Sequence, residues 1–316
     1  MPIASVKVTI NGTTTTLTDN GDGTYSGTLA APNKTSYNVN SGHYYPVTVV
    51  ATNTAGTATT ADDTHSSLGS ALRLVVKETT APTISISSPT NNQFLSKASP
   101  TFDFVITDEM NGSGVMLNNT KLVIDGVTYT PTNSSTSTWS PSSYNASLDP
   151  DDVRVGFKCG VTLVTPLTDG EHTMYITTED NDGNKATSST ITFTTDTVAP
   201  ALSVTSPAAD GYVNSAALTV VGNVTDSTSG IKALTISLNG TSVGAVTVTN
   251  GTFSKAVTLT SGTNTIVITA QDKAGRVTTI TRTITLDTST PVIAAVSITP
   301  NPVNVGSNYT VKITVQ

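Results

Sequence analysis

Short segments in which apolar and polar residues alternate recur along the whole chain. Residues 5–10, 120–124 and 233–238 place apolar side chains at alternate positions, which is the period of a strand with one buried face. Each segment is followed by a dipeptide that favours a two-residue hairpin turn: Asn11-Gly12, Asp125-Gly126 and Asn239-Gly240. The pattern therefore predicts three hairpins at equivalent places.

A second pattern recurs after each of these hairpins. A glycine leads into an alternating strand, then into a tight glycine-containing turn and a Thr-rich strand, at 42–56, 170–183 and 262–275. This order predicts a hairpin with an apolar inner face and a polar outer face.

Proline marks the starts of the repeats, at 81–89, 199–207 and 290–300. Proline cannot donate to a strand ladder, so each start is predicted to be an edge strand. Strands spaced about 8–12 residues apart, in repeats of about 90–115 residues, are typical of two-sheet sandwiches.

The sequence thus predicts an all-β fold of tandem immunoglobulin-like β-sandwiches in an elongated array. Thr- and Pro-rich linkers are expected to hold the modules in a semi-rigid line. We expect four segments: a partial module at 1–78 that lacks strands A and B, a module at 79–197 with an insertion at 131–163, a module at 198–288, and an A–B strand pair of an incomplete module at 289–316.

The end of each repeat resembles the bacterial immunoglobulin-like (Big-type) repeat. Asp272-Lys273-Ala274-Gly275 carries the late motif of that family most closely, Asp180-Asn181-Asp182-Gly183 is a variant, and the first module departs from it with Asn53. The resemblance covers nearly the whole chain. It implies a fold more than an activity, since such repeats occur in prophage tail proteins of Gram-positive bacteria, in surface adhesins and as spacers in secreted glycosidases.

Composition removes several classes of function. Of the 316 residues, 36% are hydrophobic and 12% charged, and the net charge is −7. An acidic chain without a Lys/Arg cluster is a poor ligand for nucleic acid, and no apolar run is long enough for a membrane span. The N-terminal residues carry neither the basic nor the apolar region of a secretory signal, so we expect no signal-directed export.

Acidic residues gather at the predicted entry end of the second module. Glu78 lies in the linker, Asp108 and Glu109 in one loop, and Glu179, Asp180 and Asp182 in another. Calcium takes about six to eight oxygen ligands, so these residues are candidate calcium ligands. The alternative is turn chemistry, because Asp and Asn also stabilise tight turns. The third module offers Asp196, Asp226 and Asp272, but Lys232 and Lys273 nearby weaken a cation site there.

The stretch 131–163 contains the single tryptophan of the chain, Trp139, together with Tyr144. Exposed aromatic side chains can stack on sugar rings, which makes these two residues candidate glycan-binding residues. The alternative is that Trp139 fills the sandwich core or covers an edge of a sheet.

Catalytic patterns are missing from the sequence. No G-x-S-x-G or H-E-x-x-H motif occurs, and the three histidines have no metal-ligand spacing. Cys159, the single cysteine, is expected to be a small strand hydrophobe. We predict a protein that is not an enzyme.

The first module lacks the strand pair that 289–316 supplies in excess. One hypothesis is head-to-tail self-association, in which the tail of one molecule completes the first module of another by strand addition. The alternative is a chain that continues past Gln316.

The predicted function is structural. We expect a component of a phage or prophage tail, located in the virion, that contacts other tail proteins and a glycan or protein of the host cell surface. The alternative is an exported adhesin or spacer at the bacterial surface. A third class, the binding accessory of a glycoside hydrolase, would require a catalytic domain.

Overall fold

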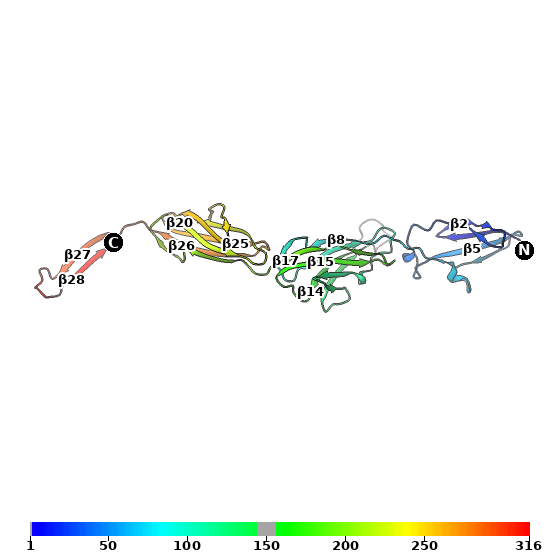
Figure 1. Ribbon diagram of the computed structural model, residues 1–316, viewed down its shortest axis with the longest axis horizontal. Coiled ribbons are helices and arrows are strands. Elements are labelled where there is room, and N and C mark those ends of the chain that lie inside the picture. The colour runs from blue at the N-terminus through cyan, green and yellow to red at the C-terminus, as the bar shows by residue number, and fades with distance from the viewer. Residues whose placement is uncertain (1, 144–155) are drawn as a thin grey trace. The chain divides into compact units, whose positions relative to one another are not determined.

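The computed structural model describes residues 2–143 and 156–316 (Figure 1). The chain forms two compact units, unit one (Met1–Thr195) and unit two (Asp196–Gln316). Within the described part of the chain the only helices are three short 3-10 turns, and no helix is long and apolar enough to cross a membrane. These turns are η1 (Ser36–Asn38), η2 (Gly69–Leu72) and η3 (Leu117–Asn119).

The first part of unit one contains a single main sheet. Its strands follow the order β2-β1-β5-β6, with β7 paired to β5, and β3 and β4 form a separate small hairpin. Val8 and Tyr45 are the two buried hydrophobic residues among the described residues of this part. The strands are β1 (Ile3–Ile10), β2 (Thr13–Thr16), β3 (Thr18–Asp19), β4 (Tyr25–Ser26), β5 (Tyr45–Asn53), β6 (Ala58–Ala61) and β7 (Arg73–Leu74).

The second part of unit one is a complete sandwich. One sheet has the order β13-β14-β10-β8, and the other has the order β12-β11-β15-β17-β9 with β16 paired to β15. Its core is led by Phe102, Phe104 and Phe193. The strands are β8 (Thr83–Ser88), β9 (Gln93–Leu95), β10 (Thr101–Thr107), β11 (Lys121–Ile124), β12 (Val127–Tyr129), β13 (Ser137–Ser143), β14 (Gly156–Leu163), β15 (Gly170–Glu179), β16 (Lys185–Thr187) and β17 (Ile191–Thr195).

Unit two begins with a second complete sandwich. Its sheets have the orders β18-β20-β24-β23 and β19-β26-β25-β21-β22, around a core that includes Phe253, Ile266 and Ile268. The strands are β18 (Ala201–Ser206), β19 (Gly211–Val213), β20 (Ala217–Thr225), β21 (Ile231–Leu238), β22 (Thr241–Ser242), β23 (Val248–Thr249), β24 (Thr252–Thr258), β25 (Gly262–Asp272) and β26 (Val277–Leu286).

The last strands of unit two form an isolated hairpin. Among the described strands, β27 (Ile293–Thr299) pairs only with β28 (Thr310–Val315). Its apolar side chains are exposed; the exposed fraction is 65% for Ile293 and 54% for Ile313. The antiparallel pair β27–β28 corresponds to the pair β18–β20 of the preceding sandwich.

The predicted fold class is confirmed: the chain is all-β, with tandem sandwiches. The predicted hairpin turns are also present. Asn11, Asp125 and Asn239 have φ angles of 47°, 49° and 52°, and the following glycines 75°, 80° and 81°, which is the pair of positive angles that a type I′ turn requires.

The stretch 131–163, predicted to be an insertion, contains two strands of the second module, β13 and β14. β14 pairs with β10 in the same way that β24 pairs with β20, and β13 pairs with β14 as β23 pairs with β24. The two strands therefore have counterparts in the third module. The chain between β12 and β14 is longer than the chain between β22 and β24, and part of that added length, residues 144–155, lies outside the described residues.

Candidate cation sites

Asp180 forms the centre of the turn that follows β15. It is fully buried, and its Oδ1 accepts hydrogen bonds from the backbone N–H groups of Asp182, Gly183 and Asn184 at 2.7–2.9 Å. Gly183 has φ +97°, a conformation that glycine adopts without steric cost. The sequence D-x-x-G therefore places a buried carboxylate at the end of this strand.

Asp108 follows β10 and folds the next loop in a similar way. Its Oδ2 accepts a hydrogen bond from the Gly114 N–H at 2.6 Å, whereas its Oδ1 is buried without a hydrogen-bond partner among the described residues. Glu78 enters from the linker: its Oε1 accepts from the Ser113 N–H at 2.6 Å, and its Oε2 is also buried without a partner. One carboxylate oxygen from each of Glu78, Asp108 and Asp180 lies within 4.8 Å of the other two.

The pKa values of Glu78, Asp108 and Glu109 are raised because these carboxyl groups are buried close together. Burial raises the pKa of Glu78 to about 7 and that of Asp108 to about 6, and nearby carboxyl groups contribute to both shifts. Burial also raises the pKa of Glu109, whose Oε2 is a further buried oxygen without a partner. A buried carboxylate without compensation is costly, so the group favours either protons or a cation.

The remaining predicted ligands have other partners. Glu179 forms an ion pair with Lys185 at 3.7 Å. Asp182 Oδ2 accepts hydrogen bonds from the Thr35 hydroxyl and from the Glu78 N–H, so this side chain joins the first and second modules. Of the six predicted residues, the structure brings together Glu78, Asp108 and Asp180, with Glu109 beside them.

A second group of three carboxylates lies in unit two, formed by Asp196, Asp226 and Asp272. Lys232 and Lys273, which are near these residues in the chain, had counted against a cation site here. Their positions in the repeat were the available signal, since they match Glu78, Asp108 and Asp180 in order along the module.

Trp139 packs at the edge of the core. Its ring lies edge-on to Phe104, with centroids 5.8 Å apart, and its indole N–H donates to the Ser137 hydroxyl at 2.9 Å. This half-buried packing corresponds to the core alternative rather than to a sugar-stacking surface. Tyr144, the other predicted glycan-binding residue, lies outside the described residues.

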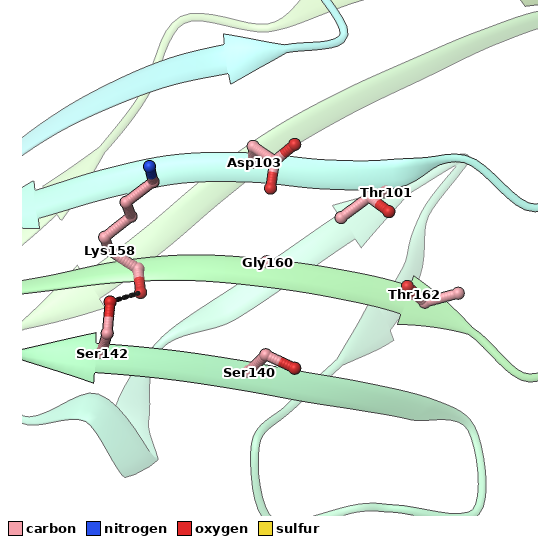
Figure 2. A pocket seen from close by; sticks show the side chains of 7 residues that line it. All are labelled: Thr101, Asp103, Ser140, Ser142, Lys158, Gly160 and Thr162. Carbon is pink, nitrogen blue, oxygen red and sulfur yellow. Dashed lines mark hydrogen bonds between the residues drawn. The ribbon is translucent and has the colours of Figure 1, made fainter.

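A shallow polar groove lies on the outer face of the same sheet (Figure 2). Its volume is about 460 Å³, and Gly160 lies on the middle strand, between Asp103 and Ser140 of the neighbouring strands. A Cβ atom at Gly160 would lie 3.3 Å from Asp103 Oδ1, so the glycine keeps the groove open. The other lining residues all carry hydroxyl groups: Thr101, Ser140, Ser142 and Thr162.

His172 and Cys159 are potentially reactive side chains, and both are buried in the second module. His172 contacts Asp125 at 2.7 Å and the Thr195 hydroxyl at 3.0 Å, an arrangement that resembles a catalytic triad. Thr195 is fully buried and donates its hydroxyl proton to the Thr168 carbonyl, so a substrate cannot reach it. Burial raises the pKa of the Cys159 thiol to about 12, which leaves it unreactive.

Comparison with known families gives a match to the third module. A family model described as glucodextranase, domain B matches residues 200–288. The chain is similar to fibronectin(III)-like modules of Clostridium thermocellum CbhA, with 13% identity over 65% of this chain and 94% of that chain and a TM-score of 0.38. No curated protein matches it.

Two further similar structures come from adhesion proteins. One is a tetra-tandem repeat in the extending region of a large adhesion protein (18% identity, 98% of this chain, 79% of that chain, TM-score 0.31). The other comes from a 1.5-MDa bacterial ice-binding adhesin (22% identity, 91% of this chain, 88% of that chain, TM-score 0.30). The sheet pairing and the match over 200–288 together show that this chain contains tandem immunoglobulin-like β-sandwiches.

Proposed function

We propose that the chain is a non-enzymatic spacer and adhesive element of a phage or prophage tail. The observation that carries the proposal is the hydrogen-bonded junction within unit one. Thr35 N–H donates to the Asn111 carbonyl at 3.1 Å, and the Asn38 side chain donates to the Gly112 carbonyl at 3.3 Å. These bonds, together with those to Asp182, connect the first module to the second. A spacer that must resist pulling requires such a connection.

Location tests this proposal against the alternative of an exported surface adhesin. Gold-labelled antibodies against the chain would be applied to induced phage particles and to whole cells of the same culture. We expect label on the tails of the particles. Label confined to the cell envelope contradicts the tail assignment and supports the adhesin.

We further propose that calcium binds between Glu78, Asp108 and Asp180, with Glu109 as an additional ligand. The buried oxygens without partners are hard anionic donors, which calcium prefers. A bound ion would stabilise the linker before β8 against the loops of the second module. Calorimetric melting of the full chain in calcium and in EDTA tests this: we expect a higher melting temperature in calcium, and equal temperatures contradict it.

Self-association is the proposed role of the exposed hairpin β27–β28. The described residues of the first module form one main sheet and the small β3–β4 hairpin, and β27–β28 corresponds to the β18–β20 pair, which belongs to the other sheet of a complete sandwich. We propose that a second copy of the chain supplies this pair. Sedimentation at high concentration is expected to show oligomers that Ile313→Asp abolishes. The control Val127→Asp changes an exposed valine of β12 and is expected to leave oligomers intact; a wild-type monomer contradicts the proposal.

The groove in Figure 2 favours a second function, binding of a cell-surface glycan. Its hydroxyls, the Asp103 carboxylate and the Lys158 ammonium can exchange hydrogen bonds with sugar hydroxyls. The test is co-sedimentation of the full chain with purified cell walls. We expect the Asp103→Asn, Lys158→Met double variant to lose binding and Lys255→Met, in unit two, to retain it. Undiminished binding by the double variant contradicts this site.

A further inference from the structure

Unit two contains a buried group of carboxylates that the proposed function does not use. One oxygen from each of Asp196, Asp226 and Asp272 lies within 4.8 Å of the other two. Asp196 and Asp272 are both 0% exposed, and Asp226 is half-buried. Three carboxylates this close repel one another unless positive charge or protons compensate them.

The three residues occupy the positions of the first candidate site. Asp196 lies three residues before Ala199-Pro200, as Glu78 lies three residues before Ala81-Pro82. Asp226 follows the last residue of β20 as Asp108 follows that of β10, and Asp272 stands in the D-x-x-G turn as Asp180 does. The two groups are therefore equivalent sites in two copies of the module.

Backbone N–H groups of the adjacent loops donate hydrogen bonds to these carboxylates, but none of them donates to Asp272 Oδ2. Asp226 Oδ1 accepts from the N–H groups of Ser229 and Gly230 at 2.9 and 2.8 Å, and Asp196 Oδ2 accepts from Ser229 at 3.1 Å. Asp272 Oδ1 accepts from the Arg276 backbone N–H at 2.8 Å. Its Oδ2 is buried and has no hydrogen-bond partner in the part of the chain that the structure describes.

Two basic side chains, Arg276 and Lys273, lie near the group. Arg276 Nε donates to the main-chain carbonyl of Asp196 at 3.1 Å. The Lys273 ammonium lies beside Gly230, 3.7 Å from where a Cβ atom would be. The orphaned Asp272 Oδ2 is an oxygen of a fully buried carboxylate that faces two other carboxylates.

We infer that Asp196, Asp226 and Asp272 bind a divalent, oxygen-preferring cation, with calcium as the ion of matching chemistry. Calcium accepts carboxylate and carbonyl oxygens in flexible geometry, so three carboxylates supply part of its shell and water the rest. The ion binds the segment before β18 to the two loops that follow β20 and β25. It replaces the hydrogen bond that Asp272 Oδ2 lacks.

The first module provides a natural comparison for the test. Asn53 occupies the position of Asp272 at the end of β5, and its Oδ1 accepts from the Ala55 and Thr57 N–H groups at 2.9 Å each. An amide therefore supports this turn as well as a carboxylate does. Asp272→Asn is expected to keep the fold and remove only the charged ligand.

Hydrogen exchange of the full chain with and without calcium ions locates the site. In the wild type we expect calcium to slow exchange at least about tenfold in the loops 226–230 and 272–276. Asp272→Asn is expected to abolish this protection. The control Asp287→Asn, at an exposed aspartate that accepts bonds from Ser289, is expected to leave it unchanged.

Two results would overturn the inference. One is exchange in 226–230 and 272–276 that millimolar calcium does not alter, which would mean that Lys273 and Arg276 balance the charge. The other is protection that persists in Asp272→Asn. The loops 108–114 and 180–184 are read in the same experiment, so failure at this site is distinguished from failure at Glu78, Asp108 and Asp180.

Discussion

Asp108→Asn tests how negative charge at the first candidate site controls stability. The wild-type Oδ1 is buried without a partner, and Oδ2 accepts from the Gly114 N–H. In the variant the amide oxygen can keep the bond to Gly114, while the amide nitrogen donates to the neighbouring carboxyl groups. The substitution thus removes a charge without removing the loop contact.

The magnitude follows from the raised pKa of Asp108. A change from 3.8 to about 6 corresponds to about 3 kcal/mol of unfolding free energy. Solvent screening around the partly exposed Glu78 and Glu109 reduces this to about 1–2 kcal/mol. Because the folded state holds the proton more tightly than the unfolded state, stability falls as pH rises from about 4 to about 6.

Calcium is expected to reverse the order of the two proteins. Without calcium near neutral pH, Asp108→Asn should be more stable than the wild type by about 1–2 kcal/mol. At a calcium concentration about 100 times the dissociation constant, the wild type gains about 3 kcal/mol, and the variant gains less because it has lost a ligand.

The assay is differential scanning calorimetry of the full chain, repeated across this pH range with EDTA and with calcium. The melting temperature of unit one, which contains Asp108, is compared between the wild type and Asp108→Asn. Asp22→Asn is the matched control, because exposed Asp22 only caps the turn at Thr24. The reasoning is refuted if wild type and Asp108→Asn have the same pH dependence in EDTA, or if calcium stabilises both equally.

Three further predictions concern the core of the sandwiches. Phe104→Ala removes a fully buried ring and is expected to cost about 3–5 kcal/mol in urea unfolding; a loss below about 1 kcal/mol would contradict the packing. Gly222→Ala brings a Cβ atom within 2.1 Å of the Ser203 carbonyl oxygen. We therefore expect weaker β18–β20 pairing and a melting temperature several degrees lower. An unchanged melting temperature would contradict the close approach of these two strands. Cys159 is expected to react with a thiol reagent only after unfolding, and rapid labelling of the native chain would disprove its burial.

The repeats and their turns could be predicted from sequence because their signals are local. Asn239-Gly240 favours positive φ at both positions, and alternation assigns one face of each strand to the core. The strand pairing of the stretch 131–163 could not be predicted from such local signals. Its role depends on the pairing of β14 with β10, a contact between residues far apart in the chain.

The carboxylate sites show the same limit. Repeat position identified Glu78, Asp108 and Asp180, but Glu179 and Asp182 are neighbours in sequence whose side chains find other partners. Sequence proximity of Lys232 and Lys273 suggested that the third module was too basic for a cation. The structure instead leaves Asp272 Oδ2 buried and unpartnered, which only three-dimensional placement could reveal.

Equilibrium dialysis of the full chain against radioactive calcium tests most directly whether these modules are calcium-binding. We expect two ions per chain, one ion in either Asp108→Asn or Asp272→Asn, and none when the two substitutions are combined. A wild-type chain that retains no calcium at millimolar concentration would contradict both cation sites and leave the acidic residues as supports of the turns alone.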